Sequence, residues 1–365
     1  MPELQWIGPE QIDGGDFSEI IDVRSPSEFA EDHVEGAVNL PVLDDAERAE
    51  VGTIYKQESS HRARRIGATL LARHAAEYLE GYLAEKPDDY SPLVYCWRGG
   101  MRSKGLATIL AAVGWRTRLL TGGYKAFRNH LLESFEELLN RKPGFRFAIL
   151  GGLTGSGKTR VLDRMSALGH QVVDLEGLAN HRGSALGEST ETMQPSQKRF
   201  ENLIWQRLRT FDVERPVILE SESSRIGKLQ IPATLWKHMG KAPLIELEVP
   251  LTKRAEFLID HYRHFVEDGE LLCTKLDLLR HLHGAEQLDA WKDQIARGAW
   301  HEFVESILAV HYDPAYLRSR KKRDRVALAT VSSDDISESG VEAAAREIAA
   351  AISSLNQAPA VPKPS

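Results

Sequence analysis

The stretch Gly152-Leu153-Thr154-Gly155-Ser156-Gly157-Lys158-Thr159 decides the fold of the second half of this chain. It follows the apolar run 145–150 and precedes a helix-like segment, 160–168. Glycines let successive backbone N–H groups converge on one point, and the dipole of the following helix is directed at the same point. Lys158 adds a mobile positive charge and Thr159 a hydroxyl group. The stretch therefore predicts a phosphate-binding loop (P-loop) for a di- or triphosphate, formed by Gly152, Gly155, Ser156, Gly157, Lys158 and Thr159.

Short apolar runs alternate with helical segments through this half of the chain. The runs with the length of buried strands are 147–150, 171–174, 217–220 and 244–249. The segment 196–211 between them has helical spacing, and such alternation predicts a parallel sheet with helical crossovers. From about residue 251 to about residue 310 the pattern is mainly helical. We therefore expect an α/β domain with a helical C-terminal part.

The strand ends near the P-loop carry glutamate where aspartate is customary. In nucleotide-hydrolysing P-loop proteins, an aspartate after a neighbouring strand holds magnesium. Here Glu220 and Glu222 end one strand, and Asp174 and Glu176 follow another. These carboxylates leave Mg²⁺ open as an ion of the reaction, but they weaken an assignment as an ordinary ATPase or kinase.

Histidines and one cysteine lie within a short span of the helical part. The set consists of His261, His264, Cys273, His281 and His283. Such side chains can bind zinc, but no C-x-x-C pair anchors this set and 262–265 has the pattern of a helix face. We expect helix packing or phosphate contacts from these residues, and no metal site.

The first half of the chain has its own chemical centre at Cys96-Trp97-Arg98-Gly99-Gly100-Met101-Arg102-Ser103. The cysteine follows a buried strand, 93–95, and the loop leads into a helix, 104–113. Backbone N–H groups of the loop, with Arg98 and Arg102, favour a thiolate and predict a lowered cysteine pKa. A buried, inert cysteine is the alternative, and the two arginines and paired glycines argue against it. We predict that Cys96 is reactive, with Arg98 and Arg102 binding an anion beside it.

Composition and length bound the class of protein. The chain has 365 residues, enough for two domains, and it is 42% hydrophobic and 27% charged, as globular proteins are. The first residues, MPELQWIGPE, show no signal peptide, and no apolar run reaches membrane-spanning length. Cys96 and Cys273 are far apart and form no disulfide framework. These features predict a cytoplasmic protein without a membrane partner.

The charge pattern is divided. The net charge of −7 does not indicate a nucleic-acid binder. Two local clusters, 318–325 and 61–65, are rich in arginine and lysine and can neutralise several phosphates. A solvated surface run is an equally good reading of both clusters.

The first half resembles a rhodanese domain. The resemblance rests on Ile21-Asp22-Val23-Arg24, the segment 33–41, the Cys96 loop and Gly122-Gly123. Rhodaneses carry sulfur or selenium on the loop cysteine. Arg102 stands one position later than the usual basic residue, and the resulting C-x5-R spacing also occurs in cysteine phosphatases and arsenate reductases.

A break at 140–144 separates the two halves. We expect a rhodanese-like parallel-sheet domain at 1–138 and a linker at 139–145. A P-loop NTPase-like α/β domain with a helical C-terminal extension follows at 146–355. The Pro- and Ala-rich tail, 356–365, is expected to be disordered.

The combination of both domains with the stretches 174–184 and 220–227 resembles the bacterial tRNA 2-selenouridine synthases. The resemblance implies action on wobble 2-thiouridine in tRNAs for Lys, Glu and Gln. It implies that geranyl diphosphate first alkylates the sulfur, and that selenium from selenophosphate then replaces the geranylthio group. The P-loop would bind the diphosphate, and Cys96 would receive or guide the selenium.

The same resemblance implies partners and contacts. No tightly bound cofactor is expected; the co-substrates are geranyl diphosphate and selenophosphate, and a protein that supplies selenophosphate is a candidate partner. The candidate contacts to substrate or tRNA are Arg182, Glu220, Arg225, Arg320 and Lys321. Two alternatives stay open: an ATP-dependent tRNA sulfurtransferase that uses a persulfide on Cys96, and a non-enzymatic module that binds phosphate and RNA.

Overall fold

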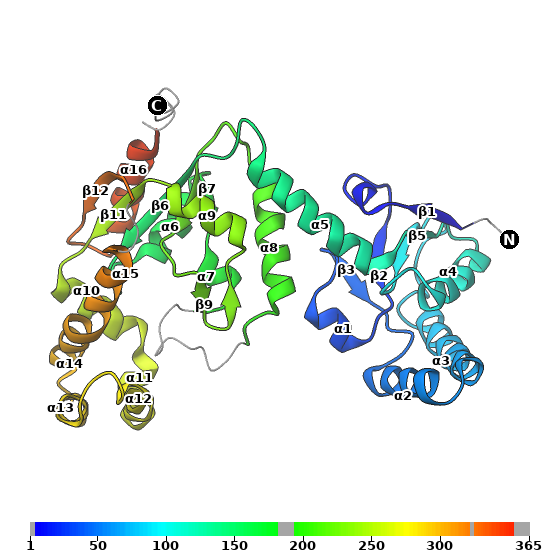
Figure 1. The fold of residues 1–365 in the computed structure, drawn as a ribbon, viewed down its shortest axis with the longest axis horizontal. Helices are drawn as coiled ribbons and strands as arrows, with labels where there is room; N and C mark the ends of the chain where they lie inside the picture. The colour runs from blue at the N-terminus through cyan, green and yellow to red at the C-terminus, as the bar shows by residue number, and fades with distance from the viewer. Residues whose placement is uncertain (1–3, 182–192, 322–324, 354–365) are drawn as a thin grey trace. The chain divides into compact units, whose positions relative to one another are not determined.

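The computed structural model describes residues 4–181, 193–321 and 325–353, without the side chains of 319–321 (Figure 1). The chain divides into two compact units, Met1–Glu137 and Leu138–Ser365. Arg182 and the expected tail, 356–365, lie outside the described residues, as do the side chains of Arg320 and Lys321.

The first unit is built on a parallel sheet with the strand order β1-β5-β4-β2-β3. The strands are β1 (Gln5–Ile7), β2 (Glu19–Asp22), β3 (Ala37–Asn39), β4 (Pro92–Tyr95) and β5 (Arg118–Leu120). Strand β4 is central, and its four residues are all buried, as expected for a continuous apolar run in a parallel sheet. Its carboxyl end leads directly into Cys96, so the sheet positions the cysteine loop.

Helices connect these strands. They are α1 (Pro26–Glu31), α2 (Asp45–Gln57), α3 (Ser60–Glu80), α4 (Met101–Val113) and α5 (Gly123–Asn140), with a 3₁₀ turn, η1, at Pro9–Gln11. A reciprocal capping box between Ser25 and Glu28 begins α1, and Pro26 occupies its first position. Helix α5 includes residues 139 and 140 of the expected linker.

The second unit contains a parallel sheet with the strand order β12-β11-β6-β8-β7. Its strands are β6 (Phe147–Gly152), β7 (Gln171–Val173), β8 (Val217–Glu220), β11 (Leu244–Glu248) and β12 (Ala327–Ser332), with a small antiparallel pair, β9 (Arg225–Ile226) and β10 (Leu229–Gln230). Four of the strands in the parallel sheet lie where the apolar runs predict them. Strand β12 was not expected, and it pairs with β11 at the edge of the sheet.

Two groups of helices complete this unit. Those near the sheet are α6 (Lys158–Ala167), α7 (Leu175–Leu178), α8 (Gln197–Arg209), α9 (Ala233–Lys241) and α16 (Glu338–Ser353). The helical part expected after residue 251 consists of α10 (Leu251–His261), α11 (Arg263–Glu267), α12 (Gly269–Leu276), η2 (Asp277–Leu279), α13 (Ala285–Ala296), α14 (Trp300–Ile307), the π-helix η3 (Leu308–Tyr312) and α15 (Asp313–Lys321).

Each group has its own hydrophobic core. Helix α16 contributes Val341, Ala345 and Ile348 to the cluster that contains the β6 and α6 side chains. The helical part packs around Phe265, Trp291 and their neighbours. No helix among the described residues has the length and apolar character needed to cross a membrane.

Candidate functional site

The P-loop connects the end of β6 to the start of α6. Gly155 and Gly157 have φ values of 82° and 77°, in the left-handed region that glycine adopts without strain. A Cβ atom on Gly155 would lie 2.8 Å from Leu258 Cδ1 and 3.1 Å from the Arg254 carbonyl oxygen. The loop therefore packs closely against α10, and only glycine fits at this position.

Side chains of the helical part form hydrogen bonds with the backbone of the P-loop. The Gly152 N–H donates to the Tyr316 hydroxyl at 2.8 Å. The buried Arg254 donates to the Thr154 carbonyl at 3.0 Å and forms two hydrogen bonds, of 2.9 and 2.8 Å, with the Asp313 carboxylate. Such two-point arginine–carboxylate pairs fix geometry as well as charge. The loop conformation thus depends on α10 and α15 as well as on its own glycines.

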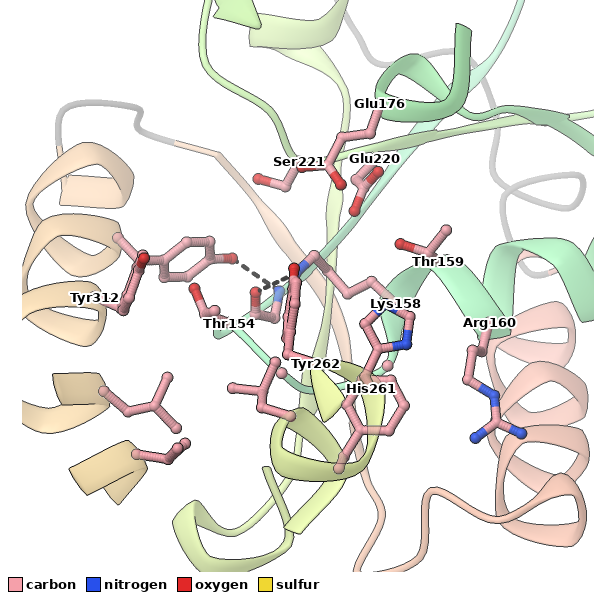
Figure 2. A pocket seen from close by; sticks show the side chains of 18 of the residues that line it. Thr154, Lys158, Thr159, Arg160, Glu176, Glu220, Ser221, His261, Tyr262 and Tyr312 are labelled. Carbon is pink, nitrogen blue, oxygen red and sulfur yellow. Dashed lines mark hydrogen bonds between the residues drawn. The ribbon is translucent and has the colours of Figure 1, made fainter. Parts of the chain in front are cut away.

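The P-loop residues face a cavity of about 1030 Å³. Gly152, Gly155, Gly157, Lys158 and Thr159 line it, and Lys158 Nζ donates to the Gly152 carbonyl at 2.9 Å. Figure 2 shows Glu176, Glu220 and Ser221 on one side of Lys158, with Tyr262 and His261 on the other. Ser156 is buried within the loop, where its N–H donates to the Leu153 carbonyl at 3.1 Å.

The cavity has a second, apolar part. Its lining there comes from α10, α11, α12, α14 and η3 in the helical part and includes Phe257, Leu258, Tyr262, Phe265, Val266, Leu272, Trp300, Phe303, Val304, Ile307 and Leu308. Pockets that are mainly apolar with a few polar groups at one end bind and orient amphipathic small molecules. The cavity can therefore take a ligand with a phosphorylated end and a hydrocarbon body.

Sequence reasoning located the polar end of this cavity but not its apolar wall. The only signal for the wall was the aromatic and aliphatic spacing in 257–266 and 300–308, which also predicts ordinary helix packing. Phe265 and Phe303 serve both purposes, because they belong to the helical core and line the cavity.

Three carboxylates meet at the polar end. Oxygen atoms of Glu176, Glu220 and Glu222 all lie within 4.8 Å of one another. Burial, followed by the neighbouring carboxylates, raises the pKa of each group above its ordinary value, while Lys158 opposes the rise. Asp174 does not belong to this group. Its carboxylate accepts a hydrogen bond from the Gly177 N–H at 2.9 Å and caps the N-terminus of α7.

The histidine and cysteine set of the helical part does not form a comparable cluster. His261 stacks on Phe257 with ring centroids 5.5 Å apart, and His283 Nε2 lies 2.9 Å from His311 Nδ1. Within the described ranges, the glutamates are the one group of three or more potential ligands that converges.

The second centre lies in the first unit, around Cys96. The thiol is buried, and its Sγ atom accepts hydrogen bonds from the Gly100 N–H and the Ser103 hydroxyl, each at 3.2 Å. Ser103 belongs to the sequence motif 96–103, but no role was predicted for it. Its position in the first turn of α4, at the start of the helix that the loop leads into, is the signal that could have assigned it. The sulfur atom therefore sits in a small cradle of donors.

Arg102 forms an ion pair that the sequence did not predict, and its binding of an anion beside the thiol stays a prediction. Its Nη1 donates to Glu28 Oε2 at 2.6 Å and its Nη2 to Glu28 Oε1 at 3.2 Å. Burial alone would raise the Glu28 pKa, but the hydrogen bonds and charge of Arg102 outweigh it and hold that pKa below its ordinary value. Arg102 thus ties α4 to α1. Arg98 is exposed in the loop.

The backbone of Gly123 packs directly against the backbone of the cysteine loop. Its φ is 60°, and a Cβ atom there would lie 2.2 Å from the Cys96 carbonyl oxygen and 2.6 Å from the Gly99 nitrogen. The next residue, Tyr124, donates its N–H to the same Cys96 carbonyl at 2.8 Å. This close approach explains why the Gly122-Gly123 pair accompanies the loop.

The remaining candidate contacts are spread over the second unit. Glu220 lines the cavity, whereas Arg225 lies exposed on β9. Arg182 and the side chains of Arg320 and Lys321 are outside the described part of the chain, so their contacts to tRNA stay predictions.

Comparison with known proteins identifies relatives over both units. The description "tRNA 2-selenouridine synthase AAA domain" matches residues 145–346, and "Rhodanese-like domain" matches residues 9–130. A tRNA 2-selenouridine synthase from Marinobacter nauticus is 34% identical over 331 residues, which cover 81% of this chain and 87% of that protein. A tRNA 2-selenouridine synthase from Cupriavidus necator is 36% identical over 338 residues, which cover 84% of this chain and 89% of that protein. A tRNA 2-selenouridine synthase from Sulfurovum sp. is 39% identical over 249 residues, which cover 67% of this chain and 65% of that protein.

Proposed function

The chain belongs to the tRNA 2-selenouridine synthase family, and from that premise we propose that it converts wobble 2-thiouridine into 2-selenouridine in two steps. In the first step, geranyl diphosphate alkylates the sulfur atom of 2-thiouridine. In the second step, selenium from selenophosphate replaces the geranylthio group. The substrates are tRNAs for Lys, Glu and Gln, and the reaction takes place in the cytoplasm.

The observation that carries this proposal is the continuity of one cavity from the P-loop to the apolar wall of the helical part. Geranyl diphosphate has a charged diphosphate at one end and a branched hydrocarbon chain at the other. A nucleotide would instead place a ribose and a polar base against a wall that includes Phe257, Val304 and Ile307, whose side chains cannot form hydrogen bonds with those groups. The lining therefore supports a prenyl diphosphate over ATP.

The geometry suits the departure of diphosphate. The sulfur atom forms a bond to C1 of the geranyl group as the C1–O bond to diphosphate breaks, and the N3 proton of the base is released to solvent. Negative charge builds on the leaving diphosphate during this step. The P-loop N–H groups and Lys158 are fixed in advance around the place where that charge develops, which lowers the barrier.

Alkylation also prepares the second step. An alkylated sulfur leaves as a neutral thiol, so selenium can add at C2 and expel geranylthiol. Selenium in selenophosphate is already at the oxidation level of selenide, and hydrolysis of the Se–P bond releases phosphate. A perselenide on Cys96 would need an added oxidant, so we assign Cys96, with the Gly100 N–H and Ser103, to guiding the selenium donor.

The test is a nucleoside assay with each component omitted in turn. The purified full chain is incubated with 2-thiouridine tRNA, geranyl diphosphate and selenophosphate, and the nucleosides are analysed by mass spectrometry. We expect S-geranyl-2-thiouridine without selenophosphate, 2-selenouridine with both donors, and no dependence on ATP. Product that forms only when ATP is consumed would favour the ATP-dependent sulfurtransferase instead. Binding of tRNA with no turnover of any donor would favour a non-enzymatic module.

A further inference from the structure

Glu176, Glu220 and Glu222 converge on one point from two elements. Glu220 ends β8 and Glu222 follows it, while Glu176 comes from the short helix after β7. Because β7 and β8 are neighbouring parallel strands, their carboxyl ends lie at the same edge of the sheet. The sheet thus brings the three side chains within 4.8 Å of one another, in the cavity that the P-loop also lines.

Three carboxylates this close together repel one another unless a positive charge lies between them. Glu220 is 1% exposed, and its Oε2 atom has no hydrogen-bond partner among the described residues. A buried polar atom without a partner is costly, and a buried carboxylate is more so. Glu176 and Glu222 bring two further carboxylates within 4.8 Å, so three acidic groups share one small region. Lys158 acts on all three carboxylates, but its Nζ donates to the Gly152 carbonyl.

We propose that Glu176, Glu220 and Glu222 bind one Mg²⁺ ion at the edge of the P-loop cavity. The three side chains offer only oxygen atoms, which are the ligands that Mg²⁺ prefers. Mg²⁺ commonly binds a few carboxylates together with substrate phosphate oxygens and water, and the P-loop places a phosphate site in the same cavity. The ion would balance the charge of the three carboxylates and supply the missing partner of Glu220 Oε2.

The site differs from the single aspartate of nucleotide-hydrolysing P-loop proteins, because it combines three glutamates from two elements. The role of the ion, which is to neutralise the diphosphate together with Lys158, rests on the proposed function. Its binding to the glutamates does not, and the two can be measured separately.

Binding is tested on the full chain after removal of divalent ions with EDTA. Mn²⁺, observed by electron paramagnetic resonance, serves as the spectroscopic probe, and calorimetry follows Mg²⁺ itself. We expect one ion per chain, with affinity reduced by about tenfold or more in Glu220→Gln and in Glu222→Gln. Glu347→Gln is the matched control, because Glu347 is exposed on α16. Its affinity should equal that of the unmodified chain.

Melting temperatures show whether the variants are folded. Glutamine is neutral and nearly isosteric, so Glu220→Gln without divalent ions should melt at or above the temperature of the unmodified chain. Added Mg²⁺ should raise the melting temperature of the unmodified chain and of Glu347→Gln, but not that of Glu220→Gln.

Two outcomes would overturn the proposal: no bound Mn²⁺ in the unmodified chain, or binding that both glutamine variants leave unchanged. Geranyl transfer at full rate in EDTA would overturn the role of the ion and leave the proposed function standing. Mn²⁺ bound through the glutamates without any geranyl transfer would support the site and count against the proposed function.

Discussion

Removing one aromatic ring from the apolar wall of the cavity should weaken the binding of geranyl diphosphate and leave the binding of pyrophosphate unchanged. Phe257 is suited to this test because it lines the cavity from α10 and is only half-buried. His261 stacks on one part of the ring and the Arg160 guanidinium lies 5.9 Å from its centroid, so a ligand can cover only the remainder. Full burial of a phenylalanine contributes about 1.5–3 kcal/mol, and we expect Phe257→Ala to lose about 1–2 kcal/mol of ligand affinity. This corresponds to about a 5- to 30-fold rise in Kd.

The assay compares two ligands in each protein. Calorimetry gives the Kd of a non-reactive geranyl thiodiphosphate and of inorganic pyrophosphate for the unmodified chain and for Phe257→Ala. Leu278→Ala is the matched control, because Leu278 is an exposed apolar residue of η2 in the same helical part. The control should leave both Kd values unchanged. An equal loss for both ligands in Phe257→Ala, or no loss for either, would refute the assignment of the apolar wall to the prenyl chain.

Four further predictions address the P-loop, the cysteine centre and the first unit. Lys158→Ala should lower the kcat/KM of geranyl transfer by about 10- to 150-fold, since hydrogen bonds to charged groups contribute about 1.5–3 kcal/mol; undiminished transfer would place the diphosphate elsewhere. Cys96→Ala should keep geranylation and lose selenation in the nucleoside assay, and equal selenation would remove Cys96 from the reaction. Gly123→Ala should destabilise the first unit by about 2 kcal/mol or more, because φ is positive and the added Cβ meets the Cys96 carbonyl; an unchanged chemical-denaturation midpoint would contradict this. The Glu28 pKa is lowered in the folded chain, so its pairing with Arg102 stabilises the fold above the unfolded pKa and is lost as pH falls through the folded pKa. Glu28→Gln should therefore cost about 1 kcal/mol at pH 7, and this cost should shrink as pH falls through the folded pKa; a cost that does not change with pH would argue against the pairing.

The P-loop and the cysteine loop could be predicted from sequence because both are local. In each, a buried strand ends in a glycine-containing loop and a helix follows, so the residues that build the site are neighbours in the chain. The family resemblance extended these local patterns to two domains, which the structure and the relatives confirm.

Features that depend on distant residues were not predictable in this way. The pairing of Arg102 with Glu28, which lies 74 positions earlier, was not predicted. The apolar wall was missed because aromatic residues at helical spacing predict core packing equally well, and Phe303 belongs to both. Strand β12 is an edge strand with only Val331 fully buried, so its sequence lacks the apolar run that marked the other strands.

The central claim is that one cavity binds the diphosphate at the P-loop and the prenyl chain against the helical part. The most direct measurement is an experimental structure of the full chain with the non-reactive geranyl thiodiphosphate. We predict density for the diphosphate within the loop Gly152–Thr159, beside Lys158, and for the hydrocarbon chain between α10 and α14. A hydrocarbon chain directed into solvent, or an analogue bound away from the loop, would contradict the account.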